Sequence, residues 1–363
     1  MMGFQLRKYV APDFSCEALR SAPDARLVPA PMDGVAPQNY HGTTIFPEYF
    51  KIDGKWLLAK ESRMDCVAVY DGQSIQVREF RNVRRGELVV VGRTEDGSEG
   101  VYVHPDGFPA AERGEDIFAF RQGRSRETAF SRDYDELYEL LKYEREHGYV
   151  VWVMGPACAF DSDSRQAFAG LVEEGYVHAL LAGNALATHD LEGAYLGTAL
   201  GQDIYTQKSR KLGHYNHLDT LNRIRGCGSI RRFIEEEHID NGIIYSCVKN
   251  DVPFVLAGSI RDDGPMPEIY ADVYAAQNAM RDHVRRATTV ICMASTLHSI
   301  ATGNMTPSFR VLEDGTVRQV YMYSVDISEF AVNKLGDRGS LSAKSILTNA
   351  QDFVVNVYRG VHR

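Results

Sequence analysis

The chain has 363 residues, and its 40 Lys and Arg against 49 Asp and Glu give a formal charge of −9. This acidity argues against a nucleic-acid partner. Hydrophobic residues make up 44% and charged residues 25% of the chain, which excludes a disordered or disulfide-rich protein and predicts a globular one of two or three domains. The longest apolar stretch, 149–160, is shorter than the roughly 18 residues that span a bilayer, so we expect no membrane partner.

The cysteines and the N-terminus predict a cytosolic protein. No C-x-x-C pair occurs, which favours reduced thiols over a disulfide framework or a zinc site. No apolar block follows Arg7 and Lys8, so a secretory signal is not expected. Cys158 follows a Gly-Pro-Ala turn, and either a reactive thiol or an ordinary core residue fits that position.

Four segments follow one another along the chain. Residues 1–31 contain four prolines and no periodicity, which predicts an N-terminal arm. Residues 32–110 carry short β-type runs separated by turns such as Asp53-Gly54, which predicts a small β domain. A charged stretch and a helix over 133–147 form a linker, 111–147.

The rest of the chain, 148–363, alternates apolar runs with helical stretches. This alternation predicts an α/β domain with a doubly wound, mostly parallel sheet covered on both faces. The expected strands are 150–154, 177–182, 253–257, 289–294 and 320–325, and the expected helices are 164–174, 215–225, 230–237, 269–286 and 328–335.

Polar or glycine-rich segments follow these strands. Glycines let a ligand approach the backbone, and an acid at a strand end suits a ribose, so together the segments predict a nucleotide site at the carboxyl edge of the sheet. The alternative is that the glycines only close tight turns and that Asp326 caps a following helix. The candidate cofactor-binding residues are Gly155, Pro156, Ala157, Gly183, Asn184, Ala185, Gly258, Ser259, Thr296, Leu297, His298 and Asp326.

Two familiar site types are not predicted. The fingerprint G-x-G-x-x-G is absent, which disfavours a standard Rossmann dinucleotide turn. His214 and His217 could share a helix face, but no third ligand is apparent nearby, so we expect no metal site.

Several long motifs resemble a known family, the LOR/SDH bifunctional enzyme conserved-domain family. This family includes archaeal-type NAD-dependent ornithine cyclodeaminases and the C-terminal part of cyanobacterial arginine dihydrolase/ornithine cyclodeaminases. The resemblance covers roughly residues 33–353 and rests on PQNYHGTTIFPEYFKIDGKWLLAKESRMDCVAV (37–69), GPA (155–157), LLAGNALATHDLEGAYLGTALG (180–201), GHYNHL (213–218), CVKNDVPFVLAGSIRDDGPMPEIYADV (247–273) and TLHSIATGNM (296–305).

The resemblance implies NAD as cofactor, an NAD-binding fold of the deoxyhypusine-synthase-like type, and assembly as a homodimer or homotetramer. It also implies conversion of L-ornithine to L-proline and ammonia. Two segments depart from the expected pattern: residues 158–162 read CAFDS where we expect VVHTG, and residues 326–329 read DISE where we expect DINP. The first departure affects a candidate site loop and leaves the exact amino-acid substrate open.

Cyclodeamination requires transient hydride transfer, a cation for the substrate carboxylate and an anion or base for its amines. We predict that Arg261 binds the carboxylate and that Asp262 or Asp263 binds the amine, although a salt bridge that only rigidifies this loop fits as well. Lys249 is a candidate base if it is buried and a solvated lysine otherwise. The alternative functions are another NAD-dependent amino- or imino-acid oxidoreductase and a noncatalytic NAD-binding sensor.

Overall fold

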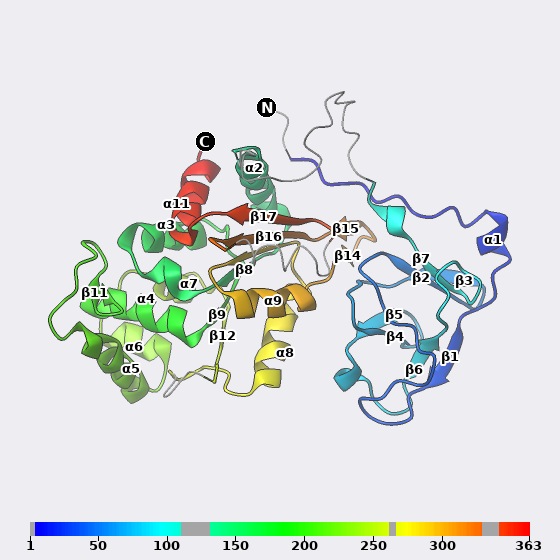
Figure 1. The fold of residues 1–363 in the computed structure, drawn as a ribbon, viewed down its shortest axis with the longest axis horizontal. Coiled ribbons are helices and arrows are strands. Elements are labelled where there is room, and N and C mark those ends of the chain that lie inside the picture. The colour runs from blue at the N-terminus through cyan, green and yellow to red at the C-terminus, as the bar shows by residue number, and fades with distance from the viewer. Residues whose placement is uncertain (1–3, 110–130, 261–265, 329–340) are drawn as a thin grey trace.

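The computed structural model describes residues 4–109, 131–260, 266–328 and 341–363. A small β domain lies beside a larger α/β domain, and the two meet along the side where the hairpin of β14 (Phe309–Val311) and β15 (Val317–Gln319) lies (Figure 1). None of the helices in these ranges has both the length and the apolar character that a membrane crossing requires.

The small β domain consists of two antiparallel sheets. Their strand orders are β1-β6-β4-β5 and β3-β2-β7, and a core that includes Phe50, Ile75 and Val101 lies between them. Asp53 and Gly54 both have positive φ, as expected for the tight turn between β2 and β3. The strands are β1 (Arg26–Pro29), β2 (Glu48–Ile52), β3 (Lys55–Leu58), β4 (Val67–Tyr70), β5 (Ile75–Arg78), β6 (Leu88–Val91) and β7 (Val101–Val103).

The segment 1–31, expected to be an arm, contributes to this domain. It contains the short helix α1 (Glu17–Arg20) and strand β1, which pairs along its whole length with β6. A strand of four residues is too short to show a periodic pattern, and its pairing partner lies about 60 residues away in sequence, as the register of Arg26 with Val91 shows. The sequence of this segment alone therefore carries little signal for it.

The α/β domain is built on a six-stranded sheet with the order β12-β9-β8-β13-β16-β17, in which every pairing is parallel. This confirms the predicted doubly wound α/β fold. The expected strands agree with the structure to within two residues, and β17 was not expected. The strands are β8 (Val150–Met154), β9 (Ala179–Gly183), β12 (Phe254–Ala257), β13 (Thr289–Met293), β16 (Tyr321–Asp326) and β17 (Ala343–Leu347).

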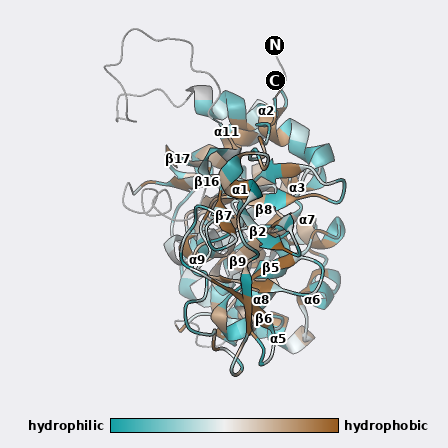
Figure 2. Ribbon diagram, turned by 90° about the vertical axis from the view of Figure 1, so that its right-hand side faces the viewer, coloured by the Kyte–Doolittle hydropathy of each residue, from teal (hydrophilic) through white to brown (hydrophobic). Residues whose placement is uncertain are grey.

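Helices cover both faces of this sheet (Figure 1). Side chains of β8 alternate between the two faces: Trp152 joins the core beneath α2, α3 and α11, whereas Val151 and Val153 join the core beneath α8 and α9. Hydrophobic and hydrophilic segments alternate along the covering helices (Figure 2). The helices are α2 (Ser131–His147), α3 (Ser162–Glu173), α4 (Asn184–Leu196), α5 (Asn216–Cys227), α6 (Ile230–Glu236), α7 (Ile243–Lys249), α8 (Val273–Val284), α9 (Thr296–Met305) and α11 (Ala350–Val361).

Polar contacts join the two domains at several points, two of which lie at Ser308 and at Glu79. The backbone N–H of Ser308, just before β14, donates to the carbonyl of Ser62 at 3.0 Å. Arg63 of the β domain and Arg281 of α8 both lie 2.6 Å from Oε1 of Glu79, and both guanidinium groups are buried. Burial alone would raise the pKa of Glu79, but Arg63, Asn82 and Arg281 lower it to about 2. The carboxylate is therefore charged at neutral pH and pairs with both domains.

A second buried ion pair fixes helix α2 to the sheet. Glu144 is fully buried and accepts hydrogen bonds from the hydroxyls of Thr288 at 2.6 Å and Thr289 at 2.9 Å, and it pairs with the buried Arg318. A Cβ at Gly148 would lie 1.4 Å from Glu144 Oε2, so residue 148 must be glycine for the pair to form. These contacts set where β8 begins.

Replacing Glu144 with Ala should destabilise the protein strongly. The change leaves the Arg318 guanidinium buried without its carboxylate, and breaking a buried pair in this way costs about 3–5 kcal/mol of unfolding free energy. Glu139→Ala is the matched control, because it removes the partially exposed pair with Lys142 on the same helix and should cost about 1 kcal/mol or less. Urea unfolding measures both, and equal losses for the two variants would contradict the assignment.

Candidate functional site

The candidate site is the carboxyl edge of the parallel sheet at the point where the strand order reverses. From β8 the chain builds outward through β9 and β12 on one side, and β13, β16 and β17 extend the sheet on the other. The loops after β8 and β13 therefore leave the sheet toward opposite faces, and a reversal of this kind is where ligand crevices form in open parallel sheets. We call the region between these two loops the crevice. The predicted cofactor-binding residues lie at the carboxyl ends of β8, β9, β12, β13 and β16. Because these strands are parallel, the residues come to one edge of the sheet.

The backbones that follow β8 and β13 touch at Gly155. The N–H of Gly155 donates to the carbonyl of Met293 at 2.9 Å. A Cβ at position 155 would lie 1.7 Å from the carbonyl oxygen of Ala294, which no side chain can tolerate. Ala294 itself has a φ of +53°, so the chain turns sharply here. Pro156 and Ala157 follow in a short 3₁₀ helix, Pro156–Ala159.

Two helices begin at this edge without a side-chain cap. Gly183 is the N-cap residue of α4 and Ser295 that of α9, and neither helix has a side-chain hydrogen bond at its N-cap. Residues Asn184 and Ala185 form the first turn of α4, and Thr296 and Leu297 form that of α9. Uncapped amides at a helix N-terminus attract anions such as a pyrophosphate.

His298 joins the two helix starts. Its Nδ1 lies 3.0 Å from the hydroxyl of Ser295, and its Cε1 would lie 2.8 Å from a Cβ at Gly183. The imidazole therefore lies directly over the glycine that begins α4. A larger residue at 183 would displace His298 from this position.

The remaining cofactor candidates lie along the same edge. Gly258 follows β12, where its N–H donates to the carbonyl of Tyr270 at 2.9 Å, and Ser259 is exposed beside it. The side-chain oxygen of Asn184 accepts from the N–H of Met266 at 3.3 Å. Asp326 ends β16 and accepts from the N–H of Ser328 at 2.9 Å, so one of its oxygens makes a local turn. The helix predicted over 328–335, which Asp326 would cap, lies outside the described residues beyond Ser328.

Only one of the four catalytic candidates, Lys249, lies among the described residues. Arg261, Asp262 and Asp263 lie outside the described residues. Lys249 is the last residue of α7, whose chain leads into the amino end of β12, opposite the crevice. Its side chain is largely exposed and its Nζ lies 4.0 Å from Glu173 Oε1. Lys249 therefore has the solvated position that the sequence analysis gave as the alternative to a buried base.

Two of the polar segments that follow the predicted strands are mostly helical: residues 183–190 lie largely in α4 and residues 295–304 in α9, and neither helix was expected. α4 was missed because eight consecutive residues, 186–193, are buried and apolar and charged side chains are mixed among them. Asp190 is fully buried and accepts from Nε of Arg165 at 2.9 Å and from the N–H groups of Ile243 and Ile244 at 3.0 and 2.8 Å. A helix that buries charge shows no apolar stripe, and the signal that remained was a run of 13 residues without proline.

A second polar network on α4 was also missed. His189 Nδ1 lies 2.9 Å from Glu192 Oε2, and the other oxygen of Glu192 accepts from the hydroxyl of Thr198 at 2.7 Å. Asn216 Nδ2 in turn donates to Thr198 at 2.8 Å. The i, i+3 spacing of His189 and Glu192 would have signalled this pair once the helix was recognised.

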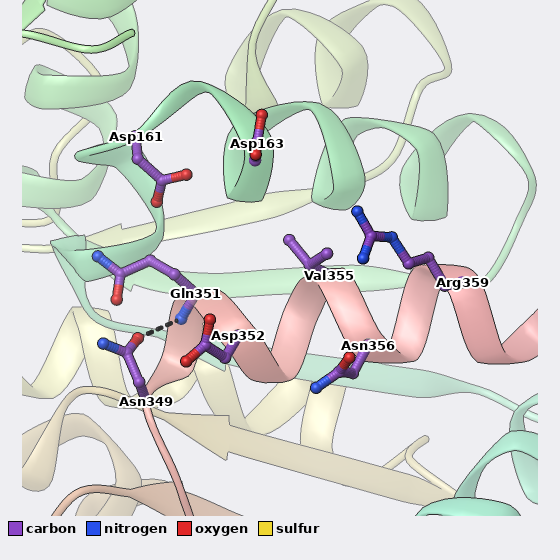
Figure 3. A pocket seen from close by; sticks show the side chains of 8 residues that line it. All are labelled: Asp161, Asp163, Asn349, Gln351, Asp352, Val355, Asn356 and Arg359. Carbon is purple, nitrogen blue, oxygen red and sulfur yellow. Dashed lines mark hydrogen bonds between the residues drawn. The ribbon is translucent and has the colours of Figure 1, made fainter. Parts of the chain in front are cut away.

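The loop that departs from the family pattern, 158–162, has structural roles. Cys158 is fully buried, its Sγ lies 3.6 Å from Met293 Sδ, and burial raises the pKa of its thiol, so it is a core residue and not a reactive one. Asp161 caps α3 through the N–H of Ser164 at 3.0 Å. It also lines a polar cavity of about 390 Å³ between the starts of α3 and α11 (Figure 3).

Replacing Gly155 with Ala should open the contact between the β8 and β13 loops. The added Cβ overlaps the Ala294 carbonyl, and such overpacking costs about 1–3 kcal/mol. Gly226→Ala is the control, because a Cβ there meets nothing within 4 Å and a helical Gly→Ala change stabilises by up to about 1 kcal/mol. Thermal unfolding compares them, and an unfolding midpoint for Gly155→Ala equal to that of the unmodified protein would refute the contact.

Comparison with known proteins gives a family whose described fold matches the parallel sheet. Two family profiles match the chain, one described as arginine dihydrolase ArgZ-like, C-terminal, Rossmann fold over residues 136–357, and one described as the first region of the same C-terminal part over residues 47–128. An ornithine cyclodeaminase of Methanopyrus kandleri is 40% identical over 362 residues, which are 99% of this chain and 82% of that protein.

Solved structures give the same grouping. A putative LOR/SDH protein from Methanococcus maripaludis superposes with a TM-score of 0.84 and 34% identity over 94% of this chain and 99% of that one. The ternary complex of AgrE with ornithine and NAD⁺ superposes with a TM-score of 0.57 and 32% identity; this chain spans 46% of its length. Since the Rossmann-fold profile spans more than half of the chain and relatives align over nearly all of it, the chain belongs to the ArgZ-like C-terminal family.

Proposed function

We propose that the chain is an NAD-dependent ornithine cyclodeaminase that converts L-ornithine to L-proline and ammonia. The observation that carries this proposal is the 40% identity with a named ornithine cyclodeaminase over 99% of the chain. The solved complex of the relative AgrE with ornithine and NAD⁺ supports both the substrate and the cofactor.

The carboxyl-edge crevice fits NAD. The uncapped starts of α4 and α9 offer amide N–H groups to a pyrophosphate, and the bare backbone at Gly155 and Gly183 lets the dinucleotide approach. When bound, NAD supplies a hydride acceptor that also returns the hydride, so the reaction has no net redox change. The role of Asp326 toward the adenosine ribose stays a prediction.

The chain's own residues have three tasks in this reaction: binding the substrate carboxylate, binding its amines and keeping water out. Arg261 remains our candidate for the carboxylate and Asp262 or Asp263 for an amine, on the loop after β12. His298 shapes the crevice between α4 and α9 through its contact with Ser295. Its imidazole positions the cofactor against the first turn of α4.

We also propose that the enzyme works in the cytosol as a homo-oligomer. The six cysteines are free thiols, as in a reducing compartment. Five large apolar side chains are exposed on the projection from β10 (Thr198–Ala199) to the start of α5, at the end of the molecule far from the β domain (Figure 1). They are Leu200, Tyr205, Leu212, Tyr215 and Leu218. An exposed apolar cluster of this kind is typical of a subunit interface.

Sedimentation equilibrium tests the assembly. We expect a mass that is a multiple of 40.6 kDa, and we expect Tyr205→Asp with Leu218→Asp to shift it to the monomer. Val10→Asp, a charge placed at an exposed valine away from the projection, is the control and should leave the mass unchanged. A monomeric wild type, or a control that dissociates as well, would contradict the proposed interface.

The activity is tested by incubating the purified protein with NAD and L-ornithine. We expect proline and ammonia in equal amounts without accumulation of NADH, because the hydride is returned to the product. Quantifying all three together separates the possibilities. NADH that accumulates in step with product would instead indicate a net oxidoreductase, and no product from any amino acid despite NAD binding would indicate a sensor.

A further inference from the structure

His189 and Glu192 form a buried dyad that the account above does not use. Glu192 is fully buried, and 11% of the His189 side chain is exposed. Both oxygens of Glu192 are held, one by His189 Nδ1 at 2.9 Å and the other by the Thr198 hydroxyl at 2.7 Å. The carboxylate has little freedom to turn away from the imidazole.

This arrangement fixes the state of the imidazole. An ionised carboxylate only accepts hydrogen bonds, so Nδ1 of His189 carries the proton that bonds Glu192. Nε2 is then the basic nitrogen of the ring. A carboxylate behind Nδ1 also stabilises the imidazolium that forms when Nε2 takes a proton, which is the arrangement of a general base.

The dyad lies beside the crevice. His189 is five residues into α4, about 8 Å along the helix from Asn184 at the sheet edge. Its ring lies 5.6 Å from that of Phe160, in the loop that follows β8. His217 lies on its other side with a ring separation of 6.1 Å, and the buried Nδ1 of His217 has no hydrogen-bond partner among the described residues. An unpaired buried nitrogen here is a group that a polar ligand can satisfy.

Two sequence motifs meet in this network. His189, Glu192 and Thr198 come from the segment 180–201, and Asn216 and His217 come from the segment 213–218. The hydrogen bond from Asn216 to Thr198 joins them.

Given the ornithine cyclodeamination proposed above, we propose that His189, held by Glu192, is the general base and acid of the reaction. The α-amino group of ornithine enters as an ammonium and must lose a proton before a hydride can leave the α-carbon. Nε2 of His189 accepts this proton. Histidine is the side chain most often used to accept and return a proton at neutral pH.

The proton balance closes within the reaction. The α-ammonium N–H bond breaks and an N–H bond forms at Nε2. The δ-ammonium loses a proton to solvent, and the free δ-amine attacks the α-carbon. The imidazolium protonates the original α-nitrogen, the ring nitrogen passes its extra proton to His189, and the C–N bond to ammonia breaks. After the hydride has returned to the α-carbon, His189 gives that proton back to the ring nitrogen, and the released ammonia takes up one proton from solvent. Dicationic ornithine with one carboxylate thus gives zwitterionic proline and ammonium, with His189 back in its starting state.

The test compares His189→Gln and Glu192→Gln with the control His283→Gln. His283 also makes one side-chain hydrogen bond, to the Tyr149 hydroxyl at 2.9 Å, but lies at the end of α8 on the opposite edge of the sheet. We expect kcat to fall at least 100-fold in His189→Gln and by a smaller factor in Glu192→Gln, with KM for ornithine and the Kd for NAD changed less than threefold. We expect imidazole added to His189→Ala to restore part of the lost kcat.

A His189→Gln enzyme that keeps its kcat would overturn the proposal, as would a loss of kcat matched by an equal loss of NAD affinity. A wild type that makes no proline would instead overturn the ornithine assignment. Carbethoxylation of His189 by diethyl pyrocarbonate, read by mass spectrometry on the full chain, separates the two claims. If NAD and α-methylornithine, which lacks the α-hydrogen, together slow the labelling of His189, the dyad lies in the crevice, whatever the natural substrate is. If the rate of labelling stays unchanged, the dyad does not lie in the crevice.

Discussion

The contact of two backbones at Gly155 is the constraint on which the site depends. Because the N–H of Gly155 bonds the Met293 carbonyl and a Cβ would overlap Ala294, the loops after β8 and β13 separate only beyond this point. The crevice therefore opens where the strand order reverses. The uncapped starts of α4 and α9 lie at the same edge of the sheet, which places partial positive charge there.

The buried polar pairs of the α/β domain have two kinds of role. Glu144 with Arg318, and Asp190 with Arg165, are buried pairs whose carboxylates also accept hydrogen bonds from neighbouring hydroxyls or helix amides. His189 differs from them, because its carboxylate partner binds one ring nitrogen and leaves the other as a base. The same helix, α4, thus carries one structural pair and one pair suited to proton transfer.

Much of the fold followed from the apolar runs. The strand 150–154 was predicted with its observed bounds, since a continuous apolar run between turns is typical of a buried parallel strand. β1 and α4 could not be predicted in this way, because β1 depends on pairing with β6 and α4 buries charge. The missing G-x-G-x-x-G disfavoured a standard Rossmann turn, whereas the matching family is described as a Rossmann fold and the sheet is parallel throughout. A close approach of two backbones occurs here at Gly155.

The site was predictable in its place but not in its chemistry. The glycines and polar residues after the strands located the crevice, because carboxyl ends of parallel strands share one edge. Lys249 was misplaced as a site candidate because a position shortly before a strand lies at the amino edge.

A structure of the chain with bound NAD tests the central claim most directly. Our account places the pyrophosphate between the starts of α4 and α9, against Gly155 and Gly183; a pyrophosphate bound in the cavity between α3 and α11, or at the junction with the β domain, would contradict it.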